Sequence, residues 1–283
     1  MILKFTIAIF FLANLALKAQ NEEKKYEFER LTRKKNRIQQ ILTYRIDLAT
    51  NDSSLTEHKF YDNLGNLIER RQYDSMGKLR YKGIFDYNDK GLCTQETGYD
   101  GNSNLLQLFI YTYDKNGNQT DYQQLSPDKK IWVHQKSVFN SQGQRIKLYN
   151  HSEERGGFYL SATFAYDSAG RAVSSTTYSI DGDTGSSDEY RYDDSGNLIE
   201  TYQVMGDQKT LVYKNRYNEK NQLTEKQYYQ RNQHITNGRP QAVPSDRRML
   251  FTYDTEGNVI DESTWNKTTL VKRTRYYFVK KIP

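Results

Sequence analysis

One short phrase, Tyr-Asp-x-x-Gly, recurs along this chain and constrains its fold more strongly than any other feature. Its first copies start at Tyr61, Tyr73, Tyr87, Tyr99 and Tyr113, at spacings that alternate between 12 and 14 residues. Later copies, some of them degenerate, start at Leu125, Phe139, Ser152, Tyr166, Tyr178, Tyr192, Val204, Tyr217, Tyr229, Tyr253 and Trp265. Two phrases therefore make a unit of 26 residues, and a fixed period of this kind is typical of repeat architectures.

Each phrase predicts a tight reversal of the chain. Asp or Asn in its second position accepts a hydrogen bond from the backbone two residues on, and Gly three residues later takes the left-handed conformation that closes a type I turn with a bulge. Segments such as 79–87 and 105–113 separate the phrases and have the length of ordinary strands. The phrase therefore predicts tandem β-hairpins.

The composition favours an all-β fold whose sheet has one solvent-exposed face. Only 36% of the residues are hydrophobic and the mean hydropathy is −0.93, yet the chain holds 24 Tyr and 12 Phe, which favour half-buried sheets. Tyr111 and Tyr113 are typical of aromatic pairs before the turns; both share one strand face, and we assign such tyrosines to the core in preference to sugar stacking. Open sheets rarely exceed about 10 strands without curling. We therefore expect a long coiled antiparallel meander, which is a spiral, a partial barrel or a cocoon-like shell.

The first residues have the form of a secretory signal. Lys4 stands in a short n-region, an apolar segment covers 5–17, and Ala19 precedes the expected cleavage before Gln20. The apolar segment is too short for a typical spanning helix, so we expect export and no stable transmembrane segment after signal removal; an N-terminal anchor or a buried strand is the alternative.

Two further regions are predicted after the signal at 1–19. Residues 20–58 are expected to form an N-terminal cap of one short helix and one strand, and 59–283 the repeat domain. The formal net charge is +6, and its densest basic run, RLTRKKNR, lies at 30–37 within the cap. No nucleic-acid reading motif accompanies this run, so we interpret it as solvated surface and expect no nucleic-acid partner.

The phrase YRYDDSGNL at 190–198 resembles the RHS/YD-repeat family, whose phrase has the form YxYDxxGNL. FTYDTEGNV at 251–259 is nearly as similar, and the repeat spacing extends the resemblance over about residues 60–277. The resemblance implies a spiralling β-shell of the kind found in toxins, adhesins and carbohydrate-binding proteins. The chain is much shorter than shells that enclose a toxic C-terminal domain, so we expect the scaffold without toxin delivery.

We find no constellation for catalysis, metal binding or a cofactor. His58, His134, His151 and His234 have no HxH or HxxxH spacing and no cysteine partners, so a zinc site is not expected. Cys93 is the single cysteine and is expected to be a small buried residue. GxSxG, Walker A and GxGxxG are absent. We therefore expect no enzyme and no cofactor.

The acidic segment that begins at Asp181 is the most conspicuous local cluster. Asp181, Asp183 and Asp188 supply the oxygen atoms that calcium prefers, but the twelfth position of an EF-hand would be Tyr192. Gly182 also stands where the repeat needs its turn glycine. We therefore interpret the segment as an expanded polar turn.

Turns of a meander alternate between two edges, and the two edges of this chain differ. The turns at Tyr61, Tyr87 and every second copy after them keep an aromatic residue followed by Asp or Asn, whereas most of those on the other edge have drifted. The drifted edge also holds the acidic segment and an insertion, because Tyr229 and Tyr253 are 24 residues apart where 14 are expected. Binding groups accumulate on one side of a rigid repeat scaffold. The candidate binding residues are Asp181, Asp183, Asp188, Asn232, His234, Arg239, Arg247 and Arg248.

These features predict an exported, non-catalytic repeat scaffold that binds a protein or a glycan at the cell envelope. It would be secreted, periplasmic or held at the cell surface. Two alternatives remain open. One is a polysaccharide-acting enzyme that uses Asp181, Asp183 and Asp188, and the other is an immunity or accessory partner of a larger repeat toxin.

Overall fold

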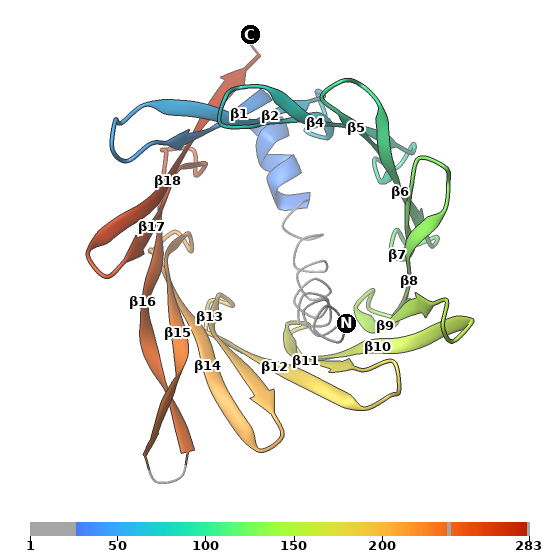
Figure 1. Ribbon diagram of the computed structural model, residues 1–283, viewed down its shortest axis with the longest axis vertical. Coiled ribbons are helices and arrows are strands. Elements are labelled where there is room, and N and C mark those ends of the chain that lie inside the picture. Colours follow the sequence, from blue (N-terminus) through green and yellow to red (C-terminus); the bar gives the residue numbers. More distant parts are fainter. Residues whose placement is uncertain (1–26, 237–238, 282–283) are drawn as a thin grey trace. The chain divides into compact units, whose positions relative to one another are not determined.

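A computed structural model of the chain describes residues 27–236 and 239–281, with the backbone alone described at 230–244. The expected signal at 1–19 and the start of the expected cap lie outside these residues. A helix at 27–35, the N-terminal helix, precedes 18 strands in the described part of the chain (Figure 1). The strands are β1 (Ile38–Ile46), β2 (Ser53–Tyr61), β3 (Leu67–Tyr73), β4 (Leu79–Tyr87), β5 (Cys93–Asp100), β6 (Leu105–Tyr113), β7 (Gln119–Leu125), β8 (Ile131–Phe139), β9 (Arg145–Ser152), β10 (Gly157–Tyr166), β11 (Ala172–Tyr178), β12 (Thr184–Tyr192), β13 (Leu198–Met205), β14 (Gln208–Tyr217), β15 (Leu223–Thr236), β16 (Arg239–Tyr253), β17 (Val259–Asn266) and β18 (Thr269–Lys280).

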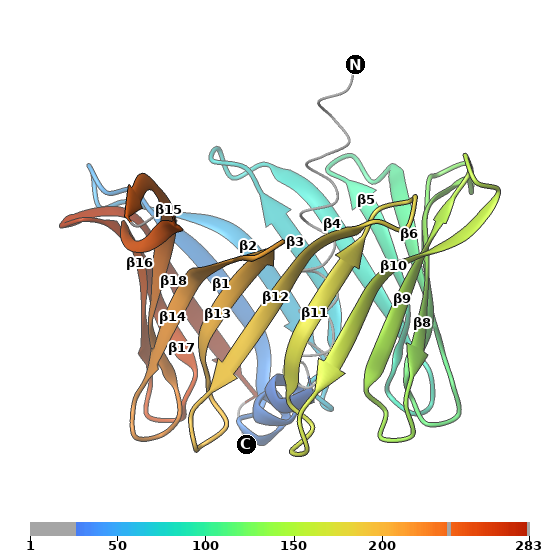
Figure 2. The ribbon, with the colours of Figure 1, turned by 90° about the horizontal axis from the view of Figure 1, so that it is seen from below.

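The strands form the predicted antiparallel meander. Each strand from β2 to β9 pairs with the next, and so does each strand from β11 to β18. Figure 2 shows strands such as β11 and β12 side by side, with their turns at two opposite edges. The all-β fold of tandem hairpins is therefore confirmed.

Where the Tyr-Asp-x-x-Gly phrase is kept, it closes the turn as its residues predict. In the turn after β12, Gly196 N donates to Asp193 O and Asp193 N donates to Asn197 O, both at 3.0 Å, while Gly196 has a φ of 83°. The Asp193 carboxylate accepts the side-chain amide of Asn197 at 2.9 Å and its backbone N at 2.8 Å, and these bonds lower the pKa of Asp193. The register shifts between Arg191 and Tyr192, which is the expected bulge.

The tyrosines that open these phrases tie neighbouring hairpins together. Tyr113 OH donates to Cys93 O at 2.7 Å, and Tyr192 OH donates to Ala172 O at 2.8 Å. The hydroxyls of Tyr87, Tyr217 and Tyr253 make the same kind of bond to Leu67 O, Leu198 O and Leu223 O. Each bond joins a turn to the start of a strand one hairpin earlier, which supports the structural role assigned to these tyrosines.

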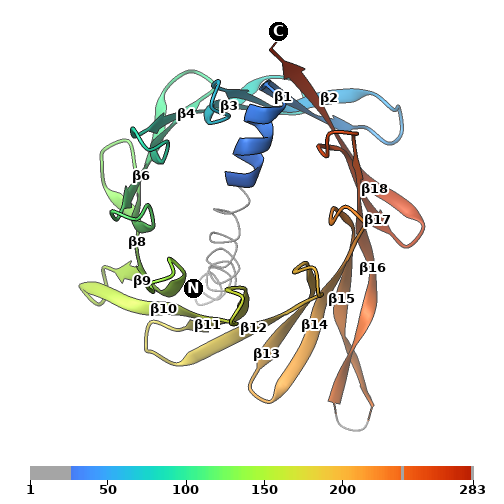
Figure 3. The same cartoon turned by 180° about the vertical axis from the view of Figure 1, so that it is seen from behind.

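Two compact units divide the chain. Unit 1 comprises residues 1–44, 53–162 and 276–283, and unit 2 comprises 45–52 and 163–275. In unit 1 the N-terminal helix lies on the concave side of the curved sheet formed by the early strands (Figures 1 and 3). Buried side chains are few and many are polar: Ile38 and Leu148 are buried in unit 1, and Tyr190 and Ser175 in unit 2. The low hydropathy of the sequence is therefore matched by a thin, partly polar core.

Candidate functional site

Two arginines hold the N-terminal helix on the first turn of the repeat. Arg30 Nη1 donates to Leu64 O at 3.0 Å, and Arg33 Nε donates to Gly65 O at 3.1 Å. The Arg33 guanidinium also lies 4.6 Å from the centroid of the Tyr61 ring. Gly65 has a φ of +81°, and a Cβ there would lie 2.3 Å from Arg30 O. Only glycine therefore permits this close approach of turn and helix.

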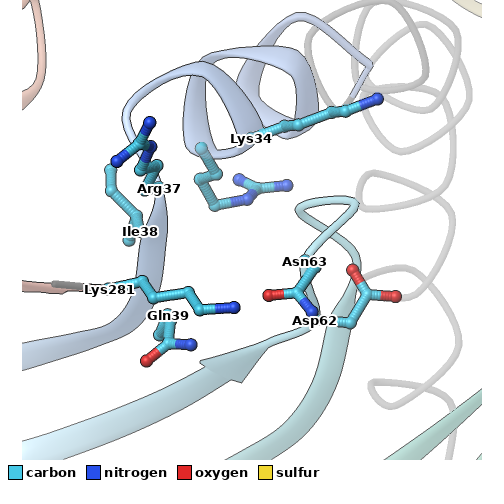
Figure 4. A pocket seen from close by; sticks show the side chains of 8 residues that line it. Lys34, Arg37, Ile38, Gln39, Asp62, Asn63 and Lys281 are labelled. Carbon is cyan, nitrogen blue, oxygen red and sulfur yellow. The ribbon is translucent and has the colours of Figure 1, made fainter. Parts of the chain in front are cut away.

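A pocket of about 320 Å³ lies beside this contact, within unit 1 (Figure 4). Its walls are the end of the helix, the start of β1, the first repeat turn and the residue that follows β18. Its lining residues are Arg33, Lys34, Arg37, Ile38, Gln39, Asp62, Asn63 and Lys281. Lys281 N donates to Arg37 O at 2.9 Å, so both backbone segments are held in place. Figure 4 shows the Lys281 side chain directed towards Asn63 across the pocket.

Positive charge dominates this pocket. Four of its lining residues are basic and one is acidic. The carboxylate of Asp62 is already used by its turn, where it accepts the backbone N of Leu64 and of Asn66, each at 2.8 Å. Lys34, Arg37 and Lys281 are exposed, and in the described part of the chain none of their side chains forms an ion pair. In Figure 4 the Lys281 side chain crosses the pocket, whereas those of Lys34 and Arg37 extend from its rim, away from Asp62 and Asn63.

A second surface of unit 1 carries exposed rings. Trp132 and His134 alternate along β8 and therefore share one face, and the register of β8 with β9 places His151 opposite His134. The Phe158 ring of β10 lies edge-on to both imidazoles, at centroid distances of 4.8 Å and 5.2 Å. Trp132 is 56% exposed and Phe158 is 37% exposed. We call these four residues the aromatic platform.

Polar side chains border the aromatic platform. His134 Nε2 lies 2.9 Å from Asp121 Oδ2 and 3.4 Å from Gln123 Nε2. Lys136 Nζ lies 4.5 Å from the centroid of the Phe158 ring. Flat apolar rings next to hydrogen-bonding groups match the two kinds of surface that a sugar presents, its C–H faces and its hydroxyls. The period-two spacing of Trp132 and His134 was visible in the sequence, but the approach of Phe158 depends on strand pairing.

Strands β3 to β5 bury a carboxylate together with its own cation. Glu96 is 7% exposed, and its Oε1 accepts Arg70 Nη2 and Tyr81 OH, each at 2.7 Å. Arg70, Gly83 and Gly98 stand in one cross-strand row, and a Cβ on Gly83 would lie 2.8 Å from Glu96 Oε1. Burial, with a smaller contribution from Glu96, raises the pKa of Tyr81 to about 12. The two glycines leave room for this cluster.

Asp188, a candidate binding residue, is buried in unit 2 without a cation. It lies in β12 between Ser175 of β11 and Gln203 of β13 and is 7% exposed. No ion pair formed within the described residues includes it. Burial raises the pKa of Asp188 to about 6, and a hydrogen bond with Tyr190 opposes the shift. The Tyr190 hydroxyl also lies 3.0 Å from Ser175 Oγ. The carboxyl group therefore has the Tyr190 hydroxyl as a hydrogen-bond partner and offers little surface to a binding partner.

Asp181 and Asp183 lie in a turn of ordinary repeat length. Ser179 N donates to Asp183 O at 2.8 Å, Gly182 has a φ of 88°, and β12 begins at Thr184. Ser179 Oγ accepts the backbone N of Asp181 and of Asp183 and replaces the usual carboxylate. The expanded turn that we expected is thus wrong in its length, because the segment after Asp183 pairs as a strand.

The insertion extends the hairpin of β15 and β16. β15 has 14 residues and β16 has 15, and they pair with each other as far as Thr236 and Arg239. The described pairing of β15 with β14 stops at Tyr228, and that of β16 with β17 begins at Arg247. Figure 3 shows β15 and β16 extending beyond the neighbouring strands. Residues 229–236 and 239–246, which we call the distal ribbon, are therefore two-stranded.

The other candidate binding residues belong to this hairpin. Asn232 and His234 lie in β15 and Arg239 in β16, within the distal ribbon. At its base the Arg247 guanidinium lies 5.0 Å from the Tyr228 ring centroid, and that of Arg248 lies 6.0 Å from the Trp265 ring. The structure thus places five of the eight candidates on one hairpin, and Asp181, Asp183 and Asp188 on another.

Solved structures that are similar to this chain include the following three. A crystal structure of TcdB2-TccC3 is 10% identical, with a TM-score of 0.34 over 81% of this chain and 17% of that chain. A porin-like protein from Bacteroides uniformis is 10% identical, with a TM-score of 0.36 over 86% of this chain and 98% of that one. A porin-like protein from Bacteroides vulgatus is 12% identical, with a TM-score of 0.29 over 85% and 97%.

No family model matches the chain, and no curated protein matches it. The likeness to RHS/YD repeats therefore rests on the turn phrase. Within the described residues, no helix is long and apolar enough to cross a membrane. The same residues contain no group of three His, Cys, Asp or Glu side chains placed to hold a metal ion.

Proposed function

We propose that this chain is an exported, non-catalytic repeat scaffold that binds a glycan at the cell envelope. The observation that carries the proposal is the aromatic platform, where Trp132 and Phe158 are exposed beside two imidazoles. The expected signal at 1–19 supports export.

The position of the platform fits an extended chain of sugars. It spans β8 to β10, and two strand spacings amount to about 10 Å. Ile110 and Val138 are also exposed, and the pairings of β6 through β8 place them on the same face as His134. Surface apolar residues that gather in this way mark binding sites more often than those scattered singly.

Binding of the mature chain to immobilised polysaccharides tests the proposal. Trp132→Ala and Phe158→Ala should each weaken binding about tenfold, or ~1.4 kcal/mol, because each removes a stacking surface. Tyr277→Ala is the matched control, since Tyr277 is an exposed aromatic residue of β18, 50% exposed. Equal losses for all three variants, or binding to no glycan, would exclude the platform. New reducing ends in the bound polysaccharide would exclude the non-catalytic part.

The distal ribbon supports a second candidate, a protein partner. Among the described residues, no strand pairs with β15 beyond Tyr228 on its β14 side or with β16 before Arg247 on its β17 side, and exposed strand edges are the surfaces that strand addition uses. Pro240 and Pro244 remove two donors from β16, so β15 is the more open edge. Replacing residues 232–241 by Asn-Gly would join Arg231 to Ala242, which already face each other, through a two-residue turn. This variant should fold and lose the partner; unchanged capture of envelope proteins would rule the ribbon out.

A further inference from the structure

We propose that the basic pocket of unit 1 binds a monosaccharide-sized acid, such as a sugar acid or a sugar phosphate. The inference does not depend on the aromatic platform, because a free sugar acid can occupy the pocket whether or not a polymer binds elsewhere. It rests on the size of the pocket, on its charge and on the way its walls are fixed.

The volume of the pocket favours a ligand larger than a single inorganic ion. Small-molecule sites in proteins have volumes of about 300 to 1,000 Å³, and this pocket of about 320 Å³ stands at the lower limit. A lone phosphate or sulfate ion would leave most of that volume to water. A single sugar ring with one charged substituent fills it better.

The lining residues supply both kinds of recognition that such a ligand needs. Lys281 is directed across the pocket towards a carboxylate or phosphate, and the exposed side chains of Lys34 and Arg37 would turn in from its rim when the anion binds. Gln39 and Asn63 add side-chain amides, each of which can donate to and accept from a hydroxyl. Because Asp62 is already bonded to its own turn, its charge is partly neutralised towards the ligand.

The walls of the pocket are positioned before any ligand arrives. The first repeat turn is fixed on the helix by the bonds of Arg30 and Arg33 to Leu64 O and Gly65 O. The chain after β18 is fixed to the residue before β1 by the bond from Lys281 N to Arg37 O. A site with a pre-ordered backbone loses less conformational entropy on binding, so a few contacts suffice for measurable affinity.

Calorimetric titration of the mature chain tests the proposal with five probes: glucuronate, glucose 6-phosphate, glucose, acetate and inorganic phosphate. The two acidic sugars should bind at least tenfold more tightly than glucose, acetate or phosphate. Lys281→Gln and Arg37→Gln should each weaken them about five- to tenfold. Lys220→Gln is the control, because Lys220 is an exposed lysine in a turn of unit 2.

The remaining outcomes each decide a part of the proposal. Equal affinity for glucose and glucuronate would overturn the role of charge. Equal affinity for phosphate and glucose 6-phosphate would overturn the sugar. Losses no larger in Lys281→Gln and Arg37→Gln than in Lys220→Gln would place the site outside the pocket. Because Arg37 and Lys281 lie outside the aromatic platform, loss of polysaccharide binding alone leaves this result unaffected.

Discussion

Among the described side chains, units 1 and 2 each bury one carboxyl group in the same kind of antiparallel sheet, but the surroundings of the two carboxyl groups differ. In unit 1, Glu96 faces Arg70 and Tyr81 across a row of two glycines. In unit 2, Asp188 has the Tyr190 hydroxyl beside it and no cation among the described residues, and burial raises its pKa to about 6. A thin sheet can therefore bury an acid either by supplying a cation or by favouring its protonated form.

The chain provides one optical reporter for each side of this comparison. It has two tryptophans, Trp132 in unit 1 and Trp265 in unit 2. In a variant with one tryptophan replaced by Phe, the fluorescence of the other reports the urea midpoint of its own unit.

The largest effect is expected when the cation of unit 1 is removed. Arg70→Met leaves Glu96 buried without its charge partner, and breaking such a pair costs about 3 to 5 kcal/mol. The midpoint reported by Trp132 at pH 7 should fall accordingly. Adding Glu96→Gln to this variant should restore part of the loss, and a double variant no better than Arg70→Met would show that the pair is not coupled.

Removing the buried carboxyl group of Asp188 should raise the stability of unit 2 rather than lower it. The pKa of Asp188 is raised above its ordinary value of 3.8, so its contribution to folding is fully present below that pH and is lost as the pH rises through about 6. Asp188→Asn should therefore stabilise unit 2 at pH 7.5, by up to roughly 3 kcal/mol for a shift of this size. The gain should shrink towards pH 5 when Trp265 is the reporter; a constant difference between pH 5 and 7.5 would contradict the assignment.

The glycine row should matter only where the ionic cluster needs its space. A Cβ on Gly83 would lie 2.8 Å from Glu96 Oε1, so Gly83→Ala should cost about 1 to 3 kcal/mol through overpacking. Gly157→Ala is the matched control, because Gly157 is also a strand glycine and a Cβ there meets nothing within 4 Å. Similar urea midpoints for the two variants would show that the row has no spatial role.

The smallest effect is expected for the tyrosine hydroxyl bonds, and it should have the same size in both units. Tyr113→Phe and Tyr192→Phe each remove one hydroxyl bond to the carbonyl of Cys93 or Ala172, worth about 0.5 to 1.5 kcal/mol. The losses measured with the two tryptophan reporters should agree within error. A large loss in one unit alone would mean that the tyrosine bonds are not an equivalent repeat feature.

The turn phrase predicted the fold well because its chemistry is local. Asp193, Gly196 and Asn197 make their bonds within five residues, and the same arrangement recurs along the chain. Arg70 and Glu96 are 26 residues apart, which is the length of one repeat, so they occupy equivalent positions in successive repeats; their contact depends on the pairing of β3, β4 and β5. The basic pocket was not predicted, because Lys281 meets Arg37 only through the pairing of the two ends of unit 1.

The tyrosine bonds also bear on how such a gene can change its length. Tyr113 reaches Cys93 and Tyr192 reaches Ala172, each 20 residues back, so every such tie is confined to one hairpin and its predecessor. Unequal recombination that adds or deletes 26 codons in frame would leave each remaining tyrosine with an equivalent carbonyl to bind. The repeat array can therefore gain or lose whole 26-residue units while the remaining units keep their local hydrogen bonds.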